Sequence, residues 1–156
     1  MKNQLLMLGA CAVGVALTVA VPQEAEAQQV SVDCSRANYS GDYCDFVLPP
    51  RFNPDPVTGT GVSGGPDYTN DCGYVDTTPD HIVTVTKGFS YLRAYVDSPG
   101  DVTLLVTGPD GRFCRDDVNG LLPVLYGSWP PGTYNIWIGD WNNSNFPYTL
   151  YLTEIQ

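Results

Sequence analysis

The stretch DVTLLVTGPDGRFCRDDVNG (residues 101–120), continued by LLPVLYGSWPPGTYNIWIGD (residues 121–140), decides the fold. Residues 102–107 and 133–138 alternate their side chains with a period of two, which is typical of strands that place one face on a core. Between these runs, Gly108-Pro109-Asp110-Gly111 predicts a tight turn, because proline presets φ and glycine accepts positive φ. The stretch therefore predicts β-strands flanking an acidic turn region that contains Cys114.

Further short strands are predicted on both sides of this stretch, at residues 82–87, 90–96, 121–126 and 148–153. No segment shows sustained helical periodicity with start and stop signals, so parallel α/β folds are excluded. The strand spacing predicts an all-β chain, folded as an antiparallel β-sandwich or a jelly-roll-like barrel.

The first residues have the pattern of an export signal. Lys2 precedes an apolar run at residues 5–21, and Ala25-Glu26-Ala27 fits a small-x-small cleavage site. Residues 1–27 are therefore predicted to be a signal peptide, with no transmembrane segment left after cleavage. Leu8-Gly9-Ala10-Cys11 is an alternative lipoprotein signal, although the run stays apolar beyond Cys11. We expect a secreted, periplasmic or cell-envelope protein.

The chain is acidic, with a formal net charge of −10 at pH 7. Loss of residues 1–27 would leave six basic and fifteen acidic residues, a net charge of −9. Nucleic acids and anionic membranes require basic patches, so we expect neither as a partner.

Four cysteines remain after cleavage: Cys34, Cys44, Cys72 and Cys114. An even number in an exported chain predicts two disulfides, with three connectivities open. We favour Cys34 with Cys44 and Cys72 with Cys114; free or metal-bound thiols are the alternative.

Proline and glycine are concentrated in residues 47–71, a composition typical of a linker or surface loop. We therefore divide the chain into a signal peptide (1–27), a disulfide-tied N-terminal extension (28–70) and a compact domain (71–156). Trimming residues 28–66 is predicted to leave a folded core.

Gly61-Val62-Ser63-Gly64-Gly65-Pro66 resembles the surroundings of a hydrolase nucleophile. A nucleophile elbow needs a strand before the serine and a helix after it, whereas Ser63 lies among prolines and glycines. His81 is the only histidine and follows the serine. We interpret Ser63 as part of a Gly/Ser linker and His81 as structural, expect no enzyme, and keep a serine hydrolase as a remote alternative.

Acidic and amide side chains gather at the predicted turns. Calcium prefers six to eight oxygen ligands, which loops rich in Asp, Asn and Gly supply. The alternative is that Arg112 and Arg115 pair with these aspartates. The candidate calcium ligands are Asp101, Asp110, Asp116, Asp117, Asn119 and Asp140.

Aromatic residues suggest a platform on which sugar rings could stack. The alternative is that they pack in the sandwich core, where aromatics are common. The candidates are Trp129, Trp137, Trp141 and Tyr151, accompanied by Tyr91, Tyr95 and Tyr126.

Several short motifs resemble, in order and spacing, the bacterial pre-peptidase C-terminal type of β-sandwich, and small secreted proteins built on that plan. They are Cys72-Gly73, Pro79-Asp80-His81, Asp101-Val102-Thr103-Leu104, Gly108-Pro109-Asp110-Gly111, Cys114 with Asp116-Asp117, Pro131-Gly132-Thr133-Tyr134, Ile136-Trp137-Ile138-Gly139, and Tyr148-Thr149-Leu150 with Thr153-Glu154.

The resemblance spans residues 71–155 and implies a non-catalytic domain that binds substrates or surfaces, in some cases with calcium. We therefore expect a secreted, non-catalytic module that binds a glycan, another surface polymer or an envelope protein, stabilised by calcium. A purely structural envelope-associated protein is the alternative.

Overall fold

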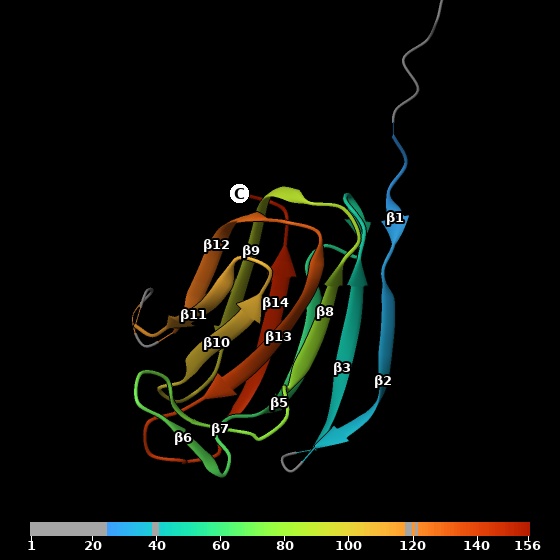
Figure 1. Cartoon of the computed structure of the whole chain (residues 1–156). Coiled ribbons are helices and arrows are strands. Elements are labelled where there is room, and N and C mark those ends of the chain that lie inside the picture. Colours follow the sequence, from blue (N-terminus) through green and yellow to red (C-terminus); the bar gives the residue numbers. More distant parts are fainter. Residues whose placement is uncertain (1–24, 39–40, 118–119, 121) are drawn as a thin grey trace, which may run out of the picture.

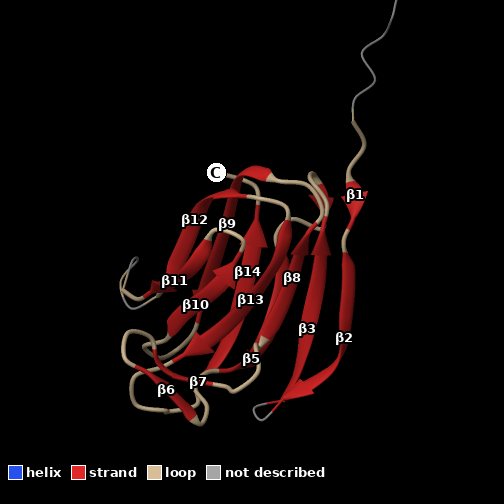
Figure 2. Ribbon diagram, viewed as in Figure 1, coloured by secondary structure: helices blue, strands red, loops and turns tan. Residues whose placement is uncertain are grey.

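The computed structural model describes residues 25–38, 41–117, 120 and 122–156. The signal segment up to residue 24, including Cys11, and Asn119 lie outside the described residues. Every regular element in the described part is a strand, as the composition predicts (Figures 1 and 2). No described helix is present that could cross a bilayer.

Two sheets pack face to face as a β-sandwich (Figure 1). The larger sheet has the order β11-β10-β13-β8-β3-β2. Its strands are β2 (Ser31–Asn38), β3 (Gly41–Leu48), β8 (His81–Val85), β10 (Thr103–Gly108), β11 (Gly111–Arg115) and β13 (Gly132–Gly139). All neighbours are antiparallel except β3 and β8, which are parallel.

The smaller sheet has four antiparallel strands in the order β12-β9-β14-β5. These are β5 (Val57–Val62), β9 (Phe89–Asp97), β12 (Val124–Trp129) and β14 (Pro147–Thr153). Two small pairs complete the fold: β1 (Gln28–Gln29) lies parallel to β4 (Phe52–Asn53), and β6 (Asp67–Thr69) forms a hairpin with β7 (Gly73–Val75).

The main core lies between the sheets and follows the predicted alternation. Leu104, Val106, Ile136 and Ile138 face it from the larger sheet, and Leu150 faces it from the smaller one. The turn between β10 and β11 pairs Gly108 with Gly111, as the Gly-Pro-Asp-Gly pattern predicts. A second, smaller cluster of Cys72, Val75 and Leu105 lies outside the main core.

Residues 41–62 are part of the sandwich and not an extension laid on it. β3 lies inside the larger sheet, and β5 pairs with β14 from Val57–Leu152 to Val62–Pro147. Phe46 and Leu48 of β3 are fully buried in the main core. The expectations of a linker here, and of a folded core after trimming residues 28–66, are therefore corrected.

Two glycines of β5 allow this segment to enter the sandwich, because their lack of a side chain leaves space for neighbouring rings. Thr58 and Thr60 point outward, whereas Gly59 and Gly61 face the interior. A Cβ atom on Gly59 would lie 2.6 Å from Cε1 of His81. The glycine content that suggested a linker instead makes room for buried rings.

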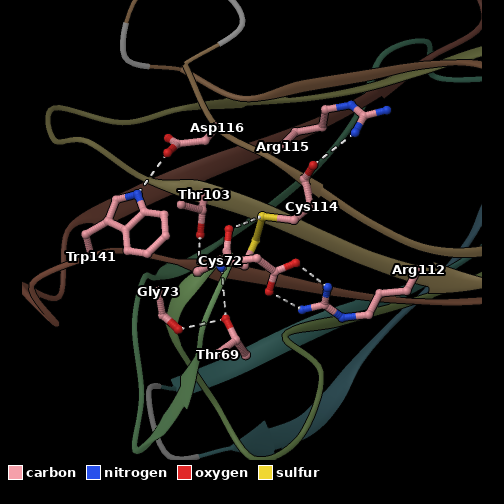
Figure 3. The surroundings of a disulfide bond; sticks show 10 residues. Thr69, Cys72, Gly73, Thr103, Arg112, Cys114, Arg115, Asp116 and Trp141 are labelled. Atoms are coloured by element: carbon pink, nitrogen blue, oxygen red, sulfur yellow. Dashed lines mark hydrogen bonds and ion pairs between the residues drawn. A yellow bond between two sulfur atoms is a disulfide. The ribbon is translucent and has the colours of Figure 1, made fainter.

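Both favoured disulfides are confirmed. Cys34–Cys44 joins β2 to β3, and Cys72–Cys114 joins the β6–β7 turn to β11. Around Cys72, its carbonyl accepts a hydrogen bond from Thr103 (2.7 Å), and its N–H donates to Oγ1 of Thr69 (3.1 Å; Figure 3). These bonds attach the small β6–β7 hairpin to the larger sheet.

Candidate functional site

A groove of about 650 Å³ lies on the outer face of the smaller sheet. Its lining includes Tyr91, Arg93 and Tyr95 of β9, Tyr126 of β12 and Tyr151 of β14. Alternate residues of a strand share a face, and strand pairing places Tyr126 opposite Arg93 and Tyr151 opposite Tyr95. We call this feature the tyrosine groove.

The side chains of the tyrosine groove are ordered by contacts among themselves. The rings of Tyr95 and Tyr151 are parallel within 6°, with centroids 4.7 Å apart. The guanidinium carbon of Arg93 lies 4.3 Å from the Tyr95 centroid, a cation–π distance. Tyr91 and Tyr126 form a second, tilted pair at 6.3 Å. The groove thus presents flat apolar faces together with hydroxyl groups and one positive charge.

The tryptophans predicted for a sugar platform do not line this groove. Trp129 is 4% exposed and packs in the core with its ring centroid 4.6 Å from that of Tyr134. Trp137 packs against the cluster of Cys72, Val75 and Leu105. Of the aromatic residues considered for the platform, the four tyrosines line the groove and the three tryptophans do not.

Trp141 has a different role, which Figure 3 shows. Its indole N–H donates a 2.8 Å hydrogen bond to Oδ2 of Asp116, directly after β11. The indole ring therefore orients a carboxylate instead of offering a stacking face.

Three of the predicted calcium ligands come together at this end of the sandwich. Asp101, Asp116 and Asp117 each place a carboxylate oxygen within 4.8 Å of the others. The Oδ1 atoms of Asp101 and Asp116 are buried and have no hydrogen-bond partner among the described residues. Burial, reinforced by Asp116, Asp117 and Asp140, raises the pKa of the Asp101 carboxyl. A cation would relieve this repulsion.

The other predicted ligands are placed differently. Asp140 is buried; its carboxylate accepts hydrogen bonds from the Ser63 hydroxyl (2.8 Å) and from the backbone N–H groups of Asn142 (3.0 Å) and Ser144 (2.8 Å). Asp140 therefore organises the loop before β14. Asp110 is exposed in the β10–β11 turn and lines a separate cavity of about 210 Å³, and Asn119 lies outside the described residues.

Ser63 and His81 have structural partners. Ser63 is buried, and besides donating to Asp140 its Oγ accepts a 3.0 Å hydrogen bond from the N–H of Phe146. Nδ1 of His81 lies 2.7 Å from the Cys44 carbonyl, and Nε2 lies 3.0 Å from the Tyr148 hydroxyl. The carbonyl requires a donor, so Nδ1 carries the proton and Nε2 accepts from Tyr148. No hydrogen bond joins Ser63 to His81 among the described residues.

Burial lowers the pKa of His81 to about 4, although the hydrogen bond to the Cys44 carbonyl acts in the opposite direction. Desolvation also raises the pKa of Tyr148 well above its usual value. The pair is therefore neutral near pH 7 and belongs to the core.

Arg93 is the functional candidate that sequence reasoning missed. The sequence contained the pattern that could have identified it, because Tyr91, Arg93 and Tyr95 are alternate residues on one face of a predicted strand.

The geometry defines the class of protein as a disulfide-bonded all-β sandwich with an aromatic groove on its smaller sheet. The chain belongs to the same family as an uncharacterized protein of Synechococcus elongatus. The two are 41% identical over 98 residues, which covers 60% of this chain and 72% of that protein. No protein-family model matches the chain.

Among solved structures, the pre-peptidase C-terminal domain of a collagenase from Bacillus anthracis is similar in fold. The TM-score is 0.46 at 14% identity, over 69% of this chain and 92% of that domain. The strand pairing described above defines the sandwich independently of this similarity.

Proposed function

We propose that this protein is an exported, non-catalytic module that binds a surface polysaccharide in the tyrosine groove. The observation that carries the proposal is the gathering of four tyrosines and one arginine from three strands on one outer sheet face. Aromatic rings in a monomeric protein are usually buried, so a hollowed aromatic face indicates a binding surface.

A carbohydrate fits the chemistry of this face better than a purely apolar ligand. Tyrosine rings offer flat faces to the C–H groups of a sugar ring, and their hydroxyls both donate and accept hydrogen bonds. The exposed hydroxyl groups of Thr58 and Thr60 continue the same face along β5, beside β14. A linear polymer could therefore contact the sheet over several sugar units.

Replacing Tyr126 by alanine is expected to weaken polysaccharide binding about tenfold, since truncating a central aromatic anchor costs more than ~1 kcal/mol. Tyr126 is 63% exposed, so its loss leaves the core unchanged. The measurement is calorimetric titration of the mature chain with soluble plant and bacterial polysaccharides.

Tyr68→Ala is the matched control, because Tyr68 is 56% exposed but lies on the β6–β7 hairpin, away from the groove strands. It should bind like the unaltered protein. Equal binding by Tyr126→Ala and the unaltered chain would contradict the proposed site, as would a complete lack of polysaccharide binding.

We further propose that calcium stabilises the module at Asp101, Asp116 and Asp117. The buried, unpartnered Oδ1 atoms of Asp101 and Asp116 support this assignment, since hard oxygen donors without partners are what Ca²⁺ requires. The ion would offset the mutual repulsion of the carboxylates and hold the end of β11 near the loop before β10.

Calcium at a hundredfold excess over its Kd is expected to raise the free energy of unfolding by about 2.7 kcal/mol, or the melting temperature by roughly 5 to 10 °C. Thermal unfolding with calcium and then with a chelator measures this shift. Asp117→Asn should abolish the shift, whereas Asp67→Asn, at an exposed carboxylate on β6, should retain it. A melting temperature that does not change when calcium is added would show that the three aspartates bind no calcium ion.

Export is supported by the two disulfides, because disulfides form and persist in oxidising compartments. The signal pattern of residues 1–27 points in the same direction. Sequencing the N-terminus of the exported protein would test the expected start at Gln28.

A further inference from the structure

Arg93 lies at the centre of the tyrosine groove. It is in the middle of β9, where strand pairing places Tyr126 on one side and Thr153 on the other. Its guanidinium group lies over the ring of Tyr95, which in turn stacks on Tyr151. The stack holds the planar group in place, so little side-chain freedom remains to be lost when a ligand binds.

The Arg93 side chain has no ion-pair partner among the described residues. The ion pairs of the described chain are Arg36–Asp45 and Arg112–Asp71, and neither includes Arg93. Its Nε atom is buried without an acceptor. Leaving a buried donor unsatisfied is costly, and the fork of a guanidinium group matches a carboxylate with two parallel hydrogen bonds. The terminal nitrogens of this group are the donors that a carboxylate from outside the chain would contact.

The charge of the rest of the protein limits which anion can bind. The chain carries a net charge of −10, and Asp97 lines the same groove. Physiological salt screens charges that are more than ~8 Å apart. A single ligand carboxylate beside Arg93 is therefore attracted by the guanidinium group, while its repulsion from distant acidic residues is screened. A densely charged polyanion would place further negative charges beside Asp97 and is disfavoured.

We propose that the tyrosine groove recognises a polysaccharide with sparse carboxylate groups, in which one uronic acid among neutral sugars binds the guanidinium group of Arg93. This inference rests on the proposed polysaccharide-binding function and adds the class of sugar. The tyrosines contact neutral sugar rings on either side, and Arg93 selects the acidic unit.

The test compares three probes by calorimetric titration of the mature chain: a neutral xylo-oligosaccharide, the same backbone with one glucuronic acid branch, and polygalacturonate. The branched probe should bind about tenfold more tightly than the neutral one, the value expected for a hydrogen-bonded charge pair. Polygalacturonate should bind more weakly than the branched probe, and its affinity should rise as salt screens the repulsion.

Arg93→Gln should bring the two xylo-oligosaccharides to within twofold of each other, because the affinity for the branched probe falls more than the affinity for the neutral probe. Arg93→Lys retains the charge without the planar fork, and it should keep only part of the preference. An unchanged melting temperature shows that each variant is folded. Tyr126→Ala, in contrast, should weaken both oligosaccharides equally.

Two failures are distinguishable. Equal binding of the neutral and acidic probes to the unaltered protein, or a preference that survives in Arg93→Gln, would overturn the uronic acid assignment and leave polysaccharide binding intact. If none of the three probes binds, both the proposed function and the assignment to Arg93 are overturned.

Discussion

Replacing Cys72 and Cys114 together by alanine is expected to lower the free energy of unfolding by about 4 kcal/mol, the chain-entropy value for a separation of 42 residues. The disulfide joins two segments that are distant in sequence, and Cys72 itself is fully buried. Its loss would free the β6–β7 turn from β11. Urea unfolding of the oxidised variant and the parent protein, monitored by circular dichroism, measures the difference.

The second disulfide supplies the matched control. Cys34 and Cys44 are separated by only 10 residues, so alanine at both positions should cost about 3 kcal/mol or less. β2 is also an edge strand of the larger sheet, with most of its described residues exposed. A larger loss from the Cys34–Cys44 variant than from the Cys72–Cys114 variant would refute this ranking.

Lowering the pH from 6.5 to 4 is expected to remove up to about 3 kcal/mol of stability through His81, at about 1.4 kcal/mol for each pH unit. The pKa of His81 is about 4 in the folded protein, whereas the ordinary pKa of histidine is 6.5. Within this range the unfolded chain binds a proton that the folded chain excludes, so stability falls with the pH. The contribution is fully present above pH 6.5. Urea unfolding at a series of pH values measures the slope.

Burial keeps His81 neutral, and Arg36 also lowers its pKa, whereas the Cys44 carbonyl and Asp45 raise it. Tyr148 donates to Nε2, and Arg36 is held nearby by Asp45 and by the carbonyl of Asp80 (2.8 Å). His81→Gln should flatten the slope between pH 4 and 6.5, because an amide offers one donor and one acceptor but does not titrate. An equally steep slope in this variant would assign the acid sensitivity to other groups.

Two carboxyl groups with shifted pKa values change the stability in a different pH range or in the opposite direction from His81. An ion pair with Arg112 lowers the pKa of Asp71, so any contribution from this exposed pair is lost only as the pH falls below the ordinary range of aspartate. Desolvation raises the pKa of Glu154, and protonation of Glu154 on acidification therefore favours the folded state. Comparison of His81→Gln with the parent protein cancels both contributions.

Local patterns predicted the strands of residues 82–153 well. Alternation located β8, β9, β10, β13 and β14 to within about two residues, since side-chain direction along a strand depends on neighbouring residues alone. β12 begins three residues later than predicted, after Pro123. Residues 111–115 were interpreted as a turn region but form β11, because pairing with β10 compensates for their weak strand pattern.

The candidate site was predicted only in part. The sequence grouped Asp101, Asp116 and Asp117 with Asp140 as candidate calcium ligands. Only the folded structure shows that the first three lie together and that Asp140 binds Ser63 and the loop before β14 instead. The aromatic pattern named the four tyrosines that line the groove, and it grouped them with three tryptophans that lie elsewhere. Which face of a sheet is covered depends on segments far away in sequence, as the packing of Trp137 beneath the β6–β7 region shows.

The sequence by itself determined the all-β class, the turn at residues 108–111 and the acidic character of the protein. These features follow from local periodicity, turn chemistry and composition. The cysteine spacing favoured the two disulfides, and the structure established their connectivity. Only the tertiary structure decided that β3 and β5 enter the sheets, that Gly59 and Gly61 make room for buried rings, and that Arg93 stands among tyrosines without an acidic partner. Each of these outcomes depends on which distant strands pair, and that choice is made by packing of the whole core.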